Sequence, residues 1–423
     1  MSRIVRMLLL VGMTLSALPV SHALAQNAVA DWQVVMESAI PGVAARKNAV
    51  GIPYWGYVTV AMYDAVNSID RRYQPFAVKV GAPAGASKDA AAASAAHDVL
   101  VHYFPAQATT LDAALATSLA KIPDGQSKND GVTVGQTVAA KWITIRTGDG
   151  LEAPLVFTPG SGPGVWEPVP SLPASPAIPA PVGVWLRAFK PFALQSADQF
   201  LAEVPAPPAL SSTEWALNFN LTKDYGAQSS TVRSATQTET GLFYTDEAAS
   251  MYSRSLRGLI LSRQLNTADS ARMVAMFYVA GSDAIAACFS AKYHYAFWRP
   301  IAAIRNADTD GNPATVADPN WVPLAPTPGH PEYPAAHGCV TQAGMDALER
   351  FFGTDEVPYS INSLVTKTTH SFTSFDDVVA EVDDARVFGG MHYRHSTRIG
   401  NRLGRMVTSY VFQRYFHRVG EDD

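Results

Sequence analysis

The feature that most constrains the fold of this chain is an apolar window from Met273 to Ala291, which approaches the length of a membrane span. The window contains Ser282 and Asp283, and it has no companion span elsewhere in the sequence. A helix that is apolar on every side is typical of the core of a large protein. We therefore expect a buried core helix, inside a helical segment that runs from Thr267 to Phe297.

The rest of the chain also favours helices. Apolar residues recur at helical spacing, and almost no stretch alternates as a strand does. The predicted N-terminal helices cover residues 32–40, 55–69, 89–103, 106–122 and 131–146, and later ones cover residues 212–223 and 246–263. Short connections between helices imply an antiparallel bundle. The predicted fold class is all-α.

Residues 151–205 differ in kind, because proline and glycine dominate them. Trp166, Trp185 and Phe189 are set among these residues, which favours an ordered connection lying on the helices over a disordered one. We predict an N-terminal bundle over residues 26–150, this connection over 151–205, and a C-terminal bundle over 206–423.

The N-terminus is typical of a secretory signal. Arg3 and Arg6 precede an apolar run, and residues 23–25 give an A-x-A cleavage site. We expect cleavage after Ala25 and export to a periplasm or beyond, with no membrane span in the mature chain; an uncleaved membrane anchor is the alternative. The net charge of −5 argues against nucleic acid as a partner.

Cys288 and Cys339 are the only cysteines, so no disulfide framework exists. An oxidising compartment would allow one bridge between them, and two buried free thiols are the alternative. The sequence leaves this choice open.

Lys292 and Arg299 form the first of three motifs. They lie seven residues apart, so on one continuous helix they would point the same way, roughly 10 Å apart along the axis. Two buried cations need an anionic partner. No Asp or Glu lies between Ile285 and Arg305, so that partner has to come from elsewhere. Cationic side chains that extend to solvent are the alternative.

The second motif is a proline-rich turn over residues 328–338, which delivers His337 to the start of a helix. A histidine at a helix N-terminus tends to stay neutral and can exchange protons near pH 7. The third motif contains Arg386 and His392, separated by Gly389-Gly390. We expect Arg386 just before a helix whose first turn presents His392, an arrangement that suits an oxyanion.

Together the three motifs, K-x6-R-P, P-x-x-H and R-x5-H, resemble the superfamily that joins vanadium-dependent haloperoxidases with type 2 phosphatidic acid phosphatases. The resemblance covers residues 292–396. It implies helical bundles of the haloperoxidase type and a cofactor, vanadate, where the phosphatases bind phosphate.

The resemblance also implies a role for each residue. Lys292, Arg299 and Arg386 would bind the equatorial oxygens of the oxyanion, together with the backbone N–H of Ala336. His392 would be the axial ligand of vanadium, or the nucleophile of a phosphatase. His337 would be the acid or base.

The sequence departs from the family pattern at four positions. Ala335 and Ala336 stand where the family usually has Ser-Gly, Ala385 stands where it has Ser, and Ser396 stands where it has Asp. The acid expected to orient His392 is therefore missing. Ser396 itself, Asp383 or Asp384 are the alternatives for that role.

Three functions remain open. The aromatic run before Arg299 and the sequence after Arg386 favour a haloperoxidase, whose substrates would be hydrogen peroxide and halide. A soluble acid phosphatase acting on a phosphate ester is the first alternative. A helical protein that binds an oxyanion without turnover is the second. The halide, the organic acceptor and the oligomeric state are not encoded in any of these motifs.

Overall fold

The computed structural model describes residues 27–40, 50–168 and 181–420. Within these ranges the chain is all-α apart from one small sheet, so the predicted fold class is confirmed. The predicted signal peptide, residues 1–25, lies outside the described residues.

The elements of the first half, in chain order, are α1 (Ala28–Ala39), α2 (Ile52–Asp70), α3 (Lys88–Tyr103), η2 (Pro105–Gln107), α4 (Ala108–Ala120), α5 (Gln126–Arg146), η3 (Val184–Arg187) and η4 (Leu201–Glu203). Those of the second half are α6 (Thr213–Gly226), α7 (Ala235–Phe243), α8 (Ala248–Ser262), α9 (Thr267–Tyr295), α10 (Pro300–Arg305), η5 (Ala307–Thr309), α11 (Ala336–Phe352), β1 (Tyr359–Asn362), β2 (Thr369–Phe372), α12 (Phe375–Phe388) and α13 (Arg394–Phe412). The two strands pair antiparallel, with Tyr359 opposite Phe372.

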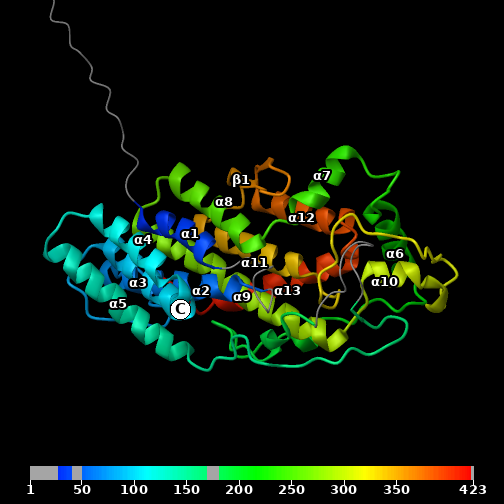
Figure 1. Cartoon of the computed structure of the whole chain (residues 1–423), viewed down its shortest axis with the longest axis horizontal. Helices are drawn as coiled ribbons and strands as arrows, with labels where there is room; N and C mark the ends of the chain where they lie inside the picture. Colours follow the sequence, from blue (N-terminus) through cyan, green and yellow to red (C-terminus); the bar gives the residue numbers. More distant parts are fainter. Residues whose placement is uncertain (1–26, 41–49, 169–180, 421–423) are drawn as a thin grey trace, which may run out of the picture.

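Helix α9 is the buried core helix that its composition predicts. It is long and apolar enough to cross a membrane, but its whole apolar window is buried inside the protein. It packs against α2 and α11, and Figure 1 shows it in the middle of an elongated molecule, with α3 and α5 toward one end and α6 and α10 toward the other. Asn266 caps its start by accepting the N–H groups of Ala268 and Asp269.

The end of α9 differs from the prediction. The helix stops at Tyr295, two residues before Phe297, because Ala296 adopts the left-handed conformation with φ of 44°. The chain therefore turns away before it reaches Arg299.

The proline-rich connection is held on α9 by one buried carboxylate. Asp283 accepts the backbone N–H groups of Phe192, Ala193 and Leu194 at 2.6, 2.7 and 2.9 Å. The aromatic residues of the connection, Trp166, Trp185 and Phe189, are all buried. The described part of the connection, which excludes residues 169–180, thus packs on the helices, and the connection as a unit over residues 151–205 stays a prediction.

A single hydrophobic core runs through the described chain, from Ala28 in α1 to Phe416 after α13. Helix α9 contributes to it beside the N-terminal helices and beside α11 and α13. The division into two bundles stays a prediction.

Helices α11 and α13 approach each other closely because glycines lie between them. A Cβ on Gly338 would lie 2.8 Å from the carbonyl oxygen of Thr397, and one on Gly400 would lie 2.6 Å from that of Ala335. The N–H of Ala335 donates to the carbonyl of Ser396 at 3.1 Å. These contacts bring the start of α11, which carries His337, against the start of α13.

Candidate active site

Lys292 lies in the last turn of α9 and is completely buried. Its Nζ donates to the carbonyl oxygens of Pro331 and Glu332, both at 2.9 Å. Burial lowers the pKa of Lys292 to about 8, and the nearby Arg299 acts in the same direction. Lys292 thus lies beneath the proline-rich turn as a cation whose charge no carboxylate neutralises directly.

Arg299 is also completely buried, but it does not share a helix with Lys292, so that expectation is wrong. The left-handed Ala296 ends α9, and Arg299 is the N-cap residue of α10, just before Pro300. The predicted convergence of the two cations still holds, because each of them contacts the turn over residues 328–338.

The guanidinium of Arg299 joins two segments of the site. Its Nε donates to the carbonyl of His330 at 2.9 Å, and one terminal nitrogen lies 3.0 Å from His330 Nδ1. The other terminal nitrogen donates to the carbonyl of Met391 at 2.9 Å and lies 3.1 Å from His392 Nε2. His330, to which the sequence assigned no role, therefore holds Arg299 in place.

The positions of Arg386 and His392 relative to the helices are the reverse of the prediction. Arg386 lies in the last turn of α12, and His392 lies in the loop before α13 instead of in that helix's first turn. The reversal occurs at Gly390, whose φ is 71° and whose Cβ position lies 2.5 Å from the carbonyl of Gly226, so only glycine fits there.

Arg386 is buried and incompletely paired. One terminal nitrogen donates to the carbonyl of Tyr244 at 3.2 Å, the other lies 3.0 Å from the sulfur of Met391, and Nε is buried without a partner. Burial and the charge of Arg299 lower its pKa. A bound oxyanion would relieve both effects.

His337 and Ala336 form the first turn of α11. The Nε2 of His337 is buried without a partner. Burial and the charge of Arg386 hold the pKa of His337 well below its usual value, so the imidazole is neutral near pH 7. The N–H of Ala336 has no intrahelical acceptor because Ala336 is the first residue of the helix.

Glu332 is the functional residue that the sequence analysis missed. It is completely buried, and its Oε1 accepts from His392 Nδ1 at 2.8 Å and from the N–H of Tyr393 at 3.1 Å. Two of the predicted alternatives have other partners: Asp383 accepts from Asn401, and Asp384 pairs with Arg394. The third, Ser396, lies beside Glu332. One signal was available, because Glu332 is the only acidic residue of the turn over residues 328–338.

The two cysteines lie beside this site. Cys288 is one turn before Lys292 on α9, and Cys339 is on α11. Both are buried and free, and contact with the Cys339 thiol lowers the pKa of Cys288 although burial opposes this. This matches the free-thiol alternative.

The charges of the site define what it can hold. Lys292, Arg299 and Arg386 are buried cations, and among the described residues Glu332 is the one carboxylate that contacts the site. The described residues contain no group of three or more His, Cys, Asp or Glu side chains suited to a bare metal cation. The Nε of Arg386 is a donor without an acceptor, and the Nε2 of His337 is a buried ring nitrogen without a partner. An anion with several oxygens, such as vanadate or phosphate, fits this set.

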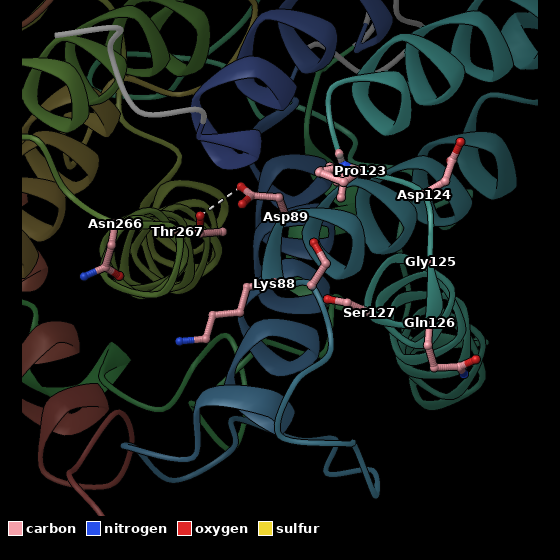
Figure 2. Close-up of a pocket in the computed structure, with 11 residues that line it drawn as sticks. Lys88, Asp89, Pro123, Asp124, Gly125, Gln126, Ser127, Asn266 and Thr267 are labelled. Carbon is pink, nitrogen blue, oxygen red and sulfur yellow. Dashed lines mark hydrogen bonds between the residues drawn. The ribbon is translucent and has the colours of Figure 1, made fainter.

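A surface pocket lies elsewhere on the described part of the chain. It has a volume of about 610 Å³ and is lined by the starts of α3, α5 and α9, with Thr267 donating to Asp89 at 2.8 Å (Figure 2). Thr267 begins α9 and Lys292 lies near its other end, so about 37 Å of helix separates them. This cavity is not part of the cluster of buried cations.

Comparisons with known proteins agree with this geometry. Residues 272–421 match the family model of the second helical-bundle domain of VCPO. A segment of 202 residues, 38% of this chain, is 30% identical to the vanadium chloroperoxidase of Curvularia inaequalis. The match spans 31% of that relative's length.

Two solved structures share the fold. A bacterial vanadium-dependent iodoperoxidase superposes with a TM-score of 0.73 at 21% identity, covering 94% of this chain and 97% of its own. A holo-type bacterial vanadium-dependent chloroperoxidase gives a TM-score of 0.68 at 15% identity, covering 90% and 97%. The fold is therefore that of the helical vanadium haloperoxidases.

The matched domain over residues 272–421 contains all three motifs, and the fold of the whole described chain is that of the helical vanadium haloperoxidases. Both findings support the resemblance to the superfamily that joins these enzymes with the type 2 phosphatidic acid phosphatases.

Proposed function

We propose that this protein is a vanadate-dependent haloperoxidase that oxidises halide with hydrogen peroxide. The observation that carries the proposal is the convergence of three buried cations, Lys292, Arg299 and Arg386, near His392, with Glu332 as the one carboxylate in contact. Relatives named for chloroperoxidase and iodoperoxidase activity support the choice of reaction.

The residues present suit vanadate. Lys292, Arg299, Arg386 and the N–H of Ala336 would hold its oxygens, and His392 Nε2 would be the ligand of vanadium. When bound, vanadate supplies an electrophilic centre that activates hydrogen peroxide toward halide. The overall reaction consumes hydrogen peroxide, halide and one proton and yields hypohalous acid and water.

The chain itself contributes charge and proton transfer. The buried cations stabilise negative charge in a site from which water is excluded, where such donors act most strongly. His337 is neutral, so its unpaired Nε2 is ready to accept a proton from hydrogen peroxide and to return it later. Lys292 is the cation that would polarise the oxygen attacked by halide.

The test is an assay of purified protein incubated with orthovanadate and freed of excess. We expect bromination of a phenol-red-type dye with peroxide and bromide, dependent on vanadate and abolished by His392→Ala. The matched control is His370→Ala, which removes a histidine that also contacts glutamate but lies outside the site. Loaded protein without halide-dependent oxidation would refute the proposal.

A chromogenic phosphate ester assayed in parallel separates the alternatives. Ester hydrolysis without bromination would assign the protein as a phosphatase with His392 as nucleophile. Tight oxyanion binding with neither activity would assign a binding protein.

We also propose that the protein is exported after cleavage of residues 1–25. The basic residues, apolar run and A-x-A site of the N-terminus support this. Sequencing of the mature N-terminus should begin at Gln26, and a retained Met1 after expression in a secreting host would contradict the proposal.

A further inference from the structure

The contact between Glu332 and His392 joins two segments that are 60 residues apart. Glu332 lies in the turn before α11, and His392 lies in the loop before α13. Both side chains are almost completely buried, so their hydrogen bond of 2.8 Å is shielded from water. The N–H of Tyr393 donates to the same oxygen and fixes the carboxylate relative to the loop.

Two contacts define which nitrogen of His392 carries the proton. A guanidinium only donates hydrogen bonds, so Nε2, 3.1 Å from Arg299, has to be the acceptor. A ring that accepts at Nε2 carries its proton on Nδ1, so Nδ1 donates to Glu332 Oε1. The same carboxylate oxygen also accepts the N–H of Tyr393, which agrees with its role as an acceptor. The ring is therefore the Nδ1–H tautomer.

We propose that Glu332 is a positioning residue, which holds His392 as the Nδ1–H tautomer and directs the lone pair of Nε2 into the oxyanion site. The proposal rests on the proposed function only for the identity of the oxyanion. A carboxylate that accepts from the remote nitrogen of an imidazole raises the basicity of the other nitrogen, and loss of such a partner typically lowers metal affinity about 10- to 100-fold.

A positioning role for Glu332 predicts a change in vanadate affinity opposite in sign to the change that charge alone would cause. Glu332 places negative charge in a site for anions, so its removal should strengthen the binding of any oxyanion held by cations alone. If Glu332 positions His392, the Glu332→Gln variant should instead bind vanadate more weakly. Inorganic phosphate, held chiefly by the cations, serves as the electrostatic reference.

The experiment compares Glu332→Gln with Asp98→Asn in the full-length protein. Asp98 is the matched control, because its Oδ1 contacts His97 Nδ1 at 2.8 Å in α3, away from the buried cations. Orthovanadate and phosphate affinities are measured by calorimetry. The tautomer of His392 is measured from ¹⁵N shifts of labelled protein, with the signal assigned through its loss in His392→Gln.

For Glu332→Gln we expect vanadate affinity to fall about 10- to 100-fold while phosphate affinity stays the same or rises. The wild type should show the Nδ1–H tautomer of His392, and Asp98→Asn should match the wild type in this tautomer and in both affinities. Tighter vanadate binding by Glu332→Gln, or an Nε2–H tautomer in the wild type, would overturn the inference. The tautomer is read without halide or peroxide, so failure of the proposed peroxidase reaction would leave this result intact.

Discussion

Replacement of Lys292 by methionine tests the charge argument directly, because methionine fills similar space without the ammonium group. Lys292 is completely buried, so solvent does not screen its interaction with a bound anion. A hydrogen bond to a charged group contributes about 1.5–3 kcal/mol, which corresponds to roughly 10- to 150-fold in affinity. We expect Lys292→Met to weaken phosphate and vanadate binding by that factor at pH 7.

The pH dependence gives a sharper signature. The pKa of Lys292 is lowered to about 8, and a bound oxyanion favours the charged form and raises this pKa. Binding of the oxyanion therefore takes up a proton at any pH at which Lys292 of the ligand-free protein is neutral. Wild-type affinity should be independent of Lys292 titration below pH 8 and should fall as the pH rises above it.

The assay is calorimetric titration of both proteins with phosphate from pH 6 to pH 9.5. The ratio of wild-type to variant affinity cancels the ionisation of phosphate itself, and it should decline only above about pH 8. Lys223→Met is the matched control, because Lys223 is a half-buried lysine of α6 that donates to the carbonyl of Val316 at 2.7 Å. A ratio that stays near one, or that does not change with pH, would refute the reasoning.

Three further predictions concern the framework of the site. Asp283→Ala leaves three buried N–H groups without their acceptor, at about 1–3 kcal/mol each, so unfolding free energy should fall by at least about 3 kcal/mol; a loss below 1 kcal/mol in a denaturant titration would contradict this. Gly338→Ala forces a Cβ to within 2.8 Å of the Thr397 carbonyl, and should cost about 1–3 kcal/mol in the same measurement. Cys288 and Cys339 should react with a thiol reagent only after denaturation, with two thiols per chain, and fewer would reveal a bridge.

The fold was predictable where local composition decides it. The apolar window in α9 has no polar face, so in a globular protein this helix has to be buried. The scarcity of alternating segments in the sequence excludes a large sheet. The short sheet was missed because each strand has four residues, too few for a periodic signal. The order and spacing of the motifs identified Lys292, Arg299 and Arg386 as candidates, and all three are buried cations near His392. Their roles in a site stay predictions.

The conformation around those residues was not predictable in the same way. Spacing suggested that Lys292 and Arg299 share a helix, but one left-handed residue, Ala296, separates them. His392 was expected inside a helix, yet Gly390 turns the chain so that the histidine precedes α13. Single backbone reversals of this kind depend on tertiary contacts, so helical periodicity does not reveal them.

Glu332 shows a different reason for failure. The residues predicted to orient His392, which were Asp383, Asp384 and Ser396, are all close to it in sequence. The actual partner comes from the turn before α11, and only the close packing of α11 against α13 brings it within 2.8 Å. A contact between residues 60 apart leaves no periodic or local pattern in a single sequence.

The way in which the buried cations are held connects the fold to its proposed chemistry. Lys292 donates to two main-chain carbonyls, Arg299 to two and to His392, and Arg386 to the carbonyl of Tyr244. Carbonyl oxygens satisfy hydrogen bonds without cancelling charge, so the positive charge remains available to a ligand. If carboxylates had paired these cations, an oxyanion would have to compete with them. The proline-rich turn and the loop before α13 supply most of these carbonyls. The ends of α9 and α12 carry Lys292 and Arg386, so helix ends present the cations and irregular segments hold them without neutralising their charge.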